Sequence, residues 1–424
     1  MSKRAICLFL VLSLIIPLRA QESSELQDSF LEAEYFRMNE DYTDALTNYL
    51  QLFEKQPDNS NLAYCIGLCY LNIPSKKNLS VDYLETATKN MSAKHKEGAI
   101  SELAAPYDAM FELGKAYRIN YRFEKAKEAF SRYLTTILPD DHENIDFVKH
   151  EIEVCDNAKN IISKPVSYSE ENVGELFNDE KSQFNPLISA DGKSFAYMVS
   201  LKFYDAVMYS KLTNGKWSPP VNITPEIQSD GDFYISGLSA DGKILLLSKD
   251  DNVNSDIYMS TLQGSDWTKA VKLNKNINTK YWESHGYMSE DGSMLIFASD
   301  RPGGFGGLDL YISHKVKGDW GPAVNMGPEV NTEFNEDRPF MINNGKTVFF
   351  SSQGNENMGG YDLFRTDLQS NGIWSVPKNL GYPINTPDDD IFFMPIDGGK
   401  AGYYSRFKDA GGYGKEDIYK ITFK

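Results

Sequence analysis

Four glycines lie within five positions in the segment SDRPGGFGGLDLYIS, residues 299–313. Glycines at this density are typical of loops that bind phosphate, because backbone N–H groups and the start of a following helix face the anion. The residues after Gly307 alternate and are rich in β-formers, however, which predicts a strand instead of a helix. No Gly-Lys-Ser/Thr sequence directly follows these glycines either. We therefore predict a turn-forming loop and no nucleotide cofactor.

The short patterns of common hydrolases are missing. The sequence contains no Gly-x-Ser-x-Gly, His-Glu-x-x-His or Cys-x-x-Cys. His285, in YWESHGYMS, is the histidine best placed for catalysis, but it has no partner at the spacing of metal ligands. The acidic clusters Asp388–Asp390 and Ser229–Asp232 lack the alternating oxygen ligands and terminal Glu of a calcium loop. We predict no catalytic residue, no metal and no cofactor.

The amino terminus has the features of an export signal. Two basic residues precede an apolar run from Ala5 to Leu18, and the small residue Ala20 ends it. This pattern predicts a signal peptide over residues 1–20, with a membrane anchor as the alternative. The whole chain has a net charge of −17, and removal of the three basic residues in the leader lowers it to −20. Such a charge disfavours nucleic acid and anionic lipid as partners. The predicted location is the periplasm, with outer-membrane association only through partners.

Three cysteines follow the predicted leader. Cys65 and Cys69 are four residues apart within LAYCIGLCYL, and Cys155 lies far along the chain. An odd number cannot pair completely within one exported chain. A metal pair would need further His or Cys nearby, so we predict that Cys65 and Cys69 are small buried side chains.

The residues from 21 to 160 have helical spacing with few glycines or prolines. The clearest repeat is YDAMFELGKAYRINYRFEKAKEAFSRYLTTILP, residues 107–139. Small residues at Gly114 and Ala126 allow two antiparallel helices to approach, and Tyr117 and Phe130 fill the space between helix pairs. Three helix pairs, an irregular insert at about residues 90–106 and a final helix predict a helical solenoid.

From Pro165 onward the pattern changes to alternation with regularly spaced turns. An Asp-Gly or Asn-Gly dipeptide, typical of hairpin turns with positive φ, recurs at intervals of 50, 50, 53 and 53 residues. Each is followed by an apolar run, a polar or glycine-rich loop and an Asp that begins another strand. Four copies continue to a tryptophan and a short fourth strand, which together predict the four-stranded blades of a β-propeller over residues 165–424. The dipeptides begin at Asp191, Asp241, Asp291, Asn344 and Asp397.

The number of blades follows from the way the ring closes. The fifth copy has only three strands, whereas the segment Glu171–Asn185 resembles the fourth-strand exit at Val324–Arg338. A strand from the start of the domain that completes the last blade removes both free sheet edges. Five blades of about 52 residues match the repeat. Six blades are the alternative.

These motifs resemble two known families. The Asp-Gly turn, the glycine-rich loop before DLY and the Trp-x-x-x-x-Asn-x-Gly exit resemble the WD-like, TolB-type propeller repeats of bacterial envelope proteins, and residues 107–139 resemble a tetratricopeptide repeat. The order of the domains is similar to that of Bacteroidetes envelope proteins that accompany type IX secretion and gliding. This sequence departs from that family in having no OmpA-like domain after the propeller.

One face of the predicted propeller is the better candidate for binding. We call it the loop face: it holds the loops between the second and third strands of each blade and the connections from each fourth strand to the next blade. Aromatic residues and arginine concentrate binding energy at interfaces. The candidate partner-binding residues are Arg301, Phe305, Tyr361, Arg406 and Tyr413.

Three functions are compatible with the sequence. The leading hypothesis is a non-catalytic envelope scaffold that binds proteins through its helical repeats and the loop face. The second is a glycan- or peptide-binding module of a nutrient-uptake system. The third is a divergent propeller hydrolase, which as a glycosidase would need paired carboxylates over a pocket.

Overall fold

The computed structural model describes residues 25–250, 254–408 and 410–424. The chain divides into two compact units, Met1–Cys155 and Asp156–Lys424. The predicted signal peptide lies outside the described residues. Among the helices of the described part, none combines the length and the apolar character that a membrane crossing requires.

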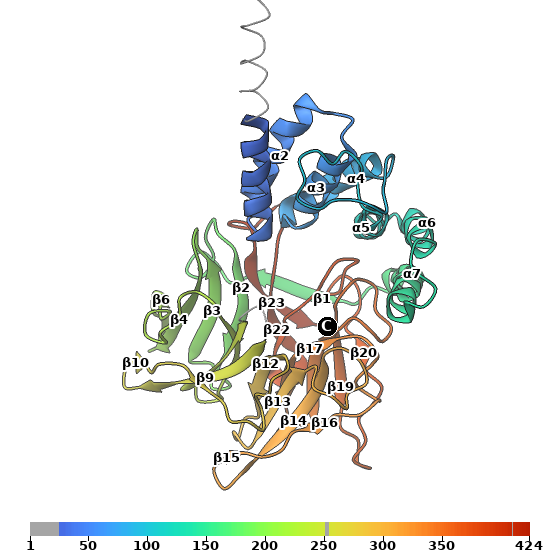
Figure 1. Cartoon of the computed structure of the whole chain (residues 1–424). Helices are drawn as coiled ribbons and strands as arrows, with labels where there is room; N and C mark the ends of the chain where they lie inside the picture. Colours follow the sequence, from blue (N-terminus) through green and yellow to red (C-terminus); the bar gives the residue numbers. More distant parts are fainter. Residues whose placement is uncertain (1–24, 251–253, 409) are drawn as a thin grey trace, which may run out of the picture. The chain divides into compact units, whose positions relative to one another are not determined.

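The first unit consists of helices that pack in sequence order (blue to teal in Figure 1). Gly67 lies against Leu84, and Gly114 lies against Phe130, where an added Cβ would be 2.5 Å from the neighbouring side chain in each case. The predicted close approach at Gly114 is therefore confirmed. The helices are residues 25–38, α2 (Tyr42–Lys55), α3 (Ser60–Leu71), α4 (Ser80–Ala87), α5 (Asp108–Ile119), α6 (Phe123–Leu134) and α7 (His142–Ile162), with a 3₁₀ turn at Pro74–Leu79.

Cys65, Cys69 and Cys155 are buried, which confirms the prediction made for the first two. Cys65 and Cys69 belong to one hydrophobic cluster of the helical unit. Burial raises the pKa of the Cys69 thiol to about 12, so this side chain stays protonated at neutral pH. Cys155, on α7, packs into a second cluster. All three therefore contribute to packing as small apolar groups.

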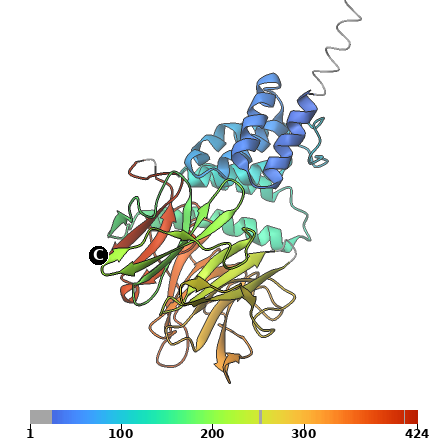
Figure 2. The same cartoon turned by 90° about the vertical axis from the view of Figure 1, so that its left-hand side faces the viewer.

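The second unit is a five-bladed β-propeller (green to red in Figures 1 and 2). The sheets are antiparallel, and the fourth position of the first three blades is divided into two strands of two residues. The strands are β2 (Gln183–Ile188), β3 (Ser194–Ser200), β4 (Asp205–Thr213), β5 (Lys216–Trp217) and β6 (Val221–Asn222) in blade one; β7 (Phe233–Leu238), β8 (Ile244–Asp250), β9 (Ser255–Gln263), β10 (Asp266–Trp267) and β11 (Val271–Lys272) in blade two; β12 (Glu283–Met288), β13 (Met294–Ser299), β14 (Asp309–Val316), β15 (Asp319–Trp320) and β16 (Val324–Asn325) in blade three; β17 (Glu336–Ile342), β18 (Thr347–Ser352), β19 (Asp362–Asp367) and β20 (Lys378–Asn379) in blade four; and β21 (Met394–Ile396), β22 (Ala401–Arg406), β23 (Asp417–Phe423) and β1 (Tyr168–Asn172) in blade five.

Strand β1 closes the ring. It precedes the first blade in sequence but pairs antiparallel with β23 of the last, with Tyr168 opposite Phe423 and Asn172 opposite Tyr419. The carboxylate of Glu170 accepts hydrogen bonds from Tyr404 and Lys408 of the same blade. The prediction of five blades closed by an N-terminal strand is confirmed, and the six-bladed alternative is wrong.

The predicted Asp-Gly turns are present, but their geometry differs from expectation. In the first three blades only the glycine has positive φ, at +68°, so these are not type I′ turns, which require positive φ at both residues. A serine hydroxyl stabilises them instead. In blade one, the Ser189 hydroxyl donates to the Asp191 carboxylate at 2.6 Å and accepts from the Ser194 amide at 2.9 Å. Asp397 and Gly398 both have positive φ, as expected for type I′.

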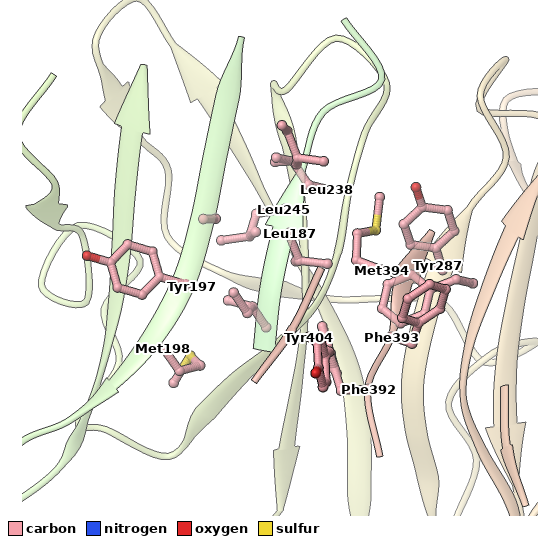
Figure 3. Close-up of a cluster of buried hydrophobic side chains, with 14 of the residues drawn as sticks. Leu187, Tyr197, Met198, Leu238, Leu245, Tyr287, Phe392, Phe393, Met394 and Tyr404 are labelled. Carbon is pink, nitrogen blue, oxygen red and sulfur yellow. The ribbon is translucent and has the colours of Figure 1, made fainter. Parts of the chain in front are cut away.

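The innermost strands of the blades bury their side chains in one continuous core. Figure 3 shows part of it: Leu187 from β2, Leu238 from β7 and Met394 from β21 belong to the same hydrophobic cluster. Tyr287 on β12 and Phe340 on β17 extend it, with ring centroids 5.1 Å apart. This shared core holds the blades in register and thereby positions the loops at their ends.

Candidate functional site: the loop face of the propeller

The Asp that begins each third strand organises the glycine-rich loop before it. In blade three, the Asp309 carboxylate accepts hydrogen bonds from the amides of Phe305, at 2.7 Å, and Gly306, at 3.2 Å. Asp362 and Asp417 accept the amides of Met358 and Tyr413 in the same way. The N–H groups that a phosphate would need are thus occupied by a carboxylate of the chain itself. This arrangement supports the prediction of a structural loop.

The glycines of this loop are needed mainly for close packing. Only Gly303 has positive φ among the four. At Gly306 an added Cβ would lie 2.3 Å from the backbone of Glu333, in the connection to the next blade. Gly359 and Gly414 approach the backbones of Asp388 and Asp179 similarly closely, at 2.0 and 2.2 Å. Positive φ, the other usual reason for glycine in a turn, therefore applies only to Gly303.

The connections between blades carry a repeated set of hydrogen bonds. In the connection after blade three, the Asn325 side chain donates to Asp309 and accepts from the amides of Gly327 and of the Asn331 side chain. Asn331 also bonds both the amide and the carbonyl of Leu310. The same pattern recurs at Asn379 and Asn385. Loop and connection therefore form one rigid unit on the loop face.

Arg301 lies inside this unit. Its guanidinium donates to the carbonyls of Asn276, at 3.2 Å, and Ile277, at 2.5 Å, and to the Glu283 carboxylate at 3.2 Å. The side chain is only 14% exposed, and its guanidinium carbon lies 4.9 and 5.0 Å from the ring centroids of Phe297 and Tyr311. Arg301 thus joins the loop of blade three to the connection from blade two.

Arg406 has a similar environment in blade five. Its guanidinium donates to the carbonyls of Pro383, at 3.2 Å, and Ile384, at 3.3 Å, and lies 4.8 Å from the ring of Tyr404. Its side chain is 19% exposed. Both predicted arginines therefore donate hydrogen bonds to groups of the chain itself.

The predicted aromatic residues divide into two groups. Phe305 and Tyr413 are exposed, at 47% and 48%, at the tips of their loops in blades three and five. Tyr361 is partly buried: its amide donates to the Asp389 carboxylate at 2.9 Å, and its carbonyl accepts from the Asp390 amide at 2.7 Å. Two of the five predicted residues are therefore exposed on the loop face, and the other three are bonded to neighbouring parts of the chain.

Sequence reasoning missed three exposed apolar residues on the same face. Phe203, in the loop between β3 and β4, is 88% exposed, and the adjacent Tyr204 is 37% exposed. Ile391, at the start of blade five, is also 37% exposed. Blade one lacks the glycine-rich loop on which the choice of candidate residues was based. The two adjacent aromatic residues before Asp205 could have indicated this part of the loop face from the sequence.

His285 lies at a β-bulge in the innermost strand of blade three. Its Nδ1 is 2.7 Å from the Ser284 hydroxyl and 3.5 Å from the Asp337 carboxylate, and that hydroxyl donates to Asp337 at 3.1 Å. Burial lowers the pKa of His285. Burial opposes ionisation of Asp337 as well, but His285 and Arg338 lower its pKa to about 2. In a hydrolytic triad the serine and the aspartate bond opposite ring nitrogens, so this cluster lacks that geometry.

The carboxylates at or just before the innermost strands of blades four and five have internal partners. Glu336 accepts the amide and hydroxyl of Thr332, at 2.8 and 2.7 Å, and the hydroxyl of Ser352 at 2.7 Å. Asp390 accepts the corresponding groups of Thr386. Burial raises the pKa of both carboxylates to about 7, against these hydrogen bonds. Over residues 25–250, 254–408 and 410–424, no group of three or more His, Cys, Asp or Glu side chains is arranged to hold a metal ion.

Comparison with known proteins places the propeller beside several solved structures. It is similar to TolB from Acinetobacter baumannii, with 16% identity and a TM-score of 0.38, over 57% of this chain and 55% of that one. A putative TolB from Agrobacterium tumefaciens has 15% identity and a TM-score of 0.34, over 61% of this chain and 98% of that one. An α-L-arabinofuranosidase from Lactobacillus brevis has 13% identity and a TM-score of 0.39, over 59% of this chain and 92% of that one.

The chain thus spans 55% of the length of the first of these structures. The fold itself, a set of helices followed by a five-bladed propeller, is given by the chain's own sheet topology. No family model matches the sequence, and no curated protein sequence does.

Proposed function

We propose that this protein is a non-catalytic, exported scaffold that binds protein partners through the loop face of its propeller. The observation that carries the proposal is the exposure of Phe203, Phe305 and Tyr413 on loops of three different blades. The backbone amides of Phe305 and Tyr413 each donate to the Asp that begins the following strand. Phe203 lies within a short loop that the Leu201 amide closes by bonding the Tyr204 carbonyl. Such bonds lower the entropic cost of binding. Rigid, exposed aromatic side chains are the type that anchors protein interfaces.

The polar groups of the same face support binding instead of catalysis. Hydrogen bonds within the chain already engage the polar groups of Glu336, Asp390 and Arg301. A glycosidase would need two carboxylates held free over a pocket. A scaffold needs only a rigid surface with exposed anchors, which is what these loops supply.

The cellular setting of the proposal comes from the sequence motifs. The leader pattern favours the periplasm, and the tetratricopeptide-like and TolB-type motifs favour an envelope complex of the kind that accompanies type IX secretion in Bacteroidetes. Association with the outer membrane would occur through partners.

Capture from envelope extracts tests the proposal. Full-length protein carrying both Phe305→Ala and Tyr413→Ala is expected to retain at most about a tenth of the partner bound by wild type, since anchor residues cost about 1–4 kcal/mol each on truncation. The matched control is Val316→Ala, which removes an apolar side chain that is 56% exposed away from the loop face. Equal capture by both variants, or retention on glycans in place of proteins, would refute the scaffold.

A further inference from the structure

The helical unit contains a cavity of about 190 Å³ that the propeller proposal does not involve. The first helix, α3, the start of α5 and the insert between α4 and α5 all contribute to its walls. Small-molecule sites usually measure roughly 300–1,000 Å³, so this cavity is sized for a side chain. Its lining residues are Glu34, Arg37, Asn61, Tyr64, Cys65, His95, Glu97, Gly98, Pro106 and Asp108.

The insert, which sequence analysis treated only as an irregularity, is an ordered wall of this cavity. Its Leu103 carbonyl accepts the amides of Ser60 and Asn61, at 3.0 and 3.3 Å, at the start of α3. The Glu102 carboxylate holds the loop together by accepting three backbone amides. His95 bonds the Asn61 side chain at 2.8 Å. Ordered loops of this length usually have a function.

The charges of the lining favour a cationic guest. Arg37 is the only Lys or Arg among the lining residues, and it is paired with Glu34 at 2.8 Å and with Glu97 at 3.1 Å. Asp108 adds a third carboxylate, of which one oxygen accepts the Tyr133 hydroxyl at 2.8 Å. The other Asp108 oxygen has no hydrogen-bond partner among the described residues. The lining therefore holds three carboxylates and one guanidinium, which leaves an excess of negative charge.

Two further groups suggest a guest that is part of a polypeptide. Asn61 is only 3% exposed, and its Oδ1 is bonded to His95, whereas its Nδ2 has no hydrogen-bond partner within the described chain. A buried amide donor of this kind needs an acceptor, such as a peptide carbonyl. Tyr64 adds an aromatic side chain to the lining, and cations bind favourably to aromatic rings.

We propose that this cavity binds a lysine or arginine side chain of an extended polypeptide. The ammonium or guanidinium group would approach Asp108 and Glu97, its alkyl stem would lie along Tyr64, and a neighbouring backbone carbonyl would accept the Asn61 amide. The proposal is independent of the propeller face, because every residue that carries it lies between positions 34 and 133.

Calorimetric titration of the full-length chain tests the proposal with three probes. These are acetyl-Gly-Gly-Lys-Gly-Gly-amide, the same peptide with norleucine in place of lysine, and propylammonium alone. We expect the lysine peptide to bind about tenfold more tightly than either other probe, and more weakly at high salt. Equal binding of the norleucine peptide would overturn the cation site, and equal binding of propylammonium would overturn the polypeptide as its source.

Substitutions of lining residues test whether the lysine peptide binds in this cavity. Asp108→Asn keeps an acceptor for Tyr133 but removes a charge, and Glu97→Gln changes a side chain that is 79% exposed. Each is expected to weaken the lysine peptide by about fivefold, as loss of one partly exposed ion pair would. Asp146→Asn, the same change at a 56% exposed position on α7, is the control. If both cavity variants bind the lysine peptide as Asp146→Asn does, the site is elsewhere and the proposal fails.

Discussion

At the scale of single residues, the loop face separates side chains that hold the fold from side chains that are free to bind. Arg301 and Phe305 are four positions apart in one loop, yet one is enclosed by carbonyls and rings and the other is half exposed. Residue type alone does not distinguish them. The difference arises because packing of blade two against blade three surrounds the arginine.

The two residues should therefore respond differently to truncation. Arg301→Ala removes the donor from two backbone carbonyls and the cation from the buried Glu283 carboxylate, which keeps its hydrogen bonds from Thr279 and Ser299. The substitution is expected to destabilise the propeller by about 2–4 kcal/mol. Phe305→Ala should change the free energy of unfolding by less than about 1 kcal/mol. All five tryptophans lie between Trp217 and Trp374, so their fluorescence during denaturation reports the propeller alone. Equal stability losses would contradict this assignment.

Glu336 gives the propeller a pH dependence whose sign follows from its pKa. The folded value of about 7 exceeds the ordinary 4.5, so the folded state holds the proton more tightly. The resulting stabilisation is present below about pH 4.5 and is lost as the pH rises through 7.

A glutamine at this position should remove that dependence. Blade one already has Gln183 here, and it bonds both the amide and the carboxylate of Asp179. Between pH 5 and 8, wild type should lose on the order of 2 kcal/mol relative to Glu336→Gln, as measured by urea unfolding at each pH. A difference between the two proteins that stays constant with pH would show that Glu336 is ionised throughout.

At the scale of elements, the strands of each blade could be predicted from the sequence because the patterns that mark them are local. An Asp-Gly turn, an Asp that caps its loop and a tryptophan in the fourth position each depend on neighbours within about thirty residues. Contacts between blades were not predictable in this way. The approach of Gly306 to Glu333 and the burial of Arg301 both arise where a loop of one blade packs against the connection between two blades. The sequence pattern of a single segment does not show which other segment will pack against it.

Closure by β1 is the element whose loss should matter most. Replacing Tyr168–Asn172 by five Gly and Ser residues removes the outer strand of blade five and the bonds of Glu170 to Tyr404 and Lys408. We expect the tryptophan unfolding transition to lose at least about 3 kcal/mol, since a whole strand and a buried carboxylate pairing are lost. The same replacement at residues 315–319, an exposed hairpin tip, should cost far less. Similar losses would mean that the ring does not depend on closure.

At the scale of the whole molecule, we propose one surface for polypeptide partners on each of the two units. The propeller presents exposed aromatics on rigid loops, and the helical unit contains an acidic cavity walled by the insert. The sequence indicated helices followed by a propeller, together with the loop face as a candidate. It did not indicate the cavity, because Glu34, Asn61 and Asp108 come from three helices that are adjacent only after folding.

Site-specific photo-crosslinking in living cells tests the central claim most directly. A benzoylphenylalanine side chain at Phe305 or Tyr413 would react only with a protein that lies against the loop face. We expect each position to give a discrete adduct of higher mass, and the same side chain at Val316, which is 56% exposed elsewhere on the propeller, to give none. Adducts at Val316 equal to those at Phe305 and Tyr413, or none at any position, would contradict a partner-binding loop face.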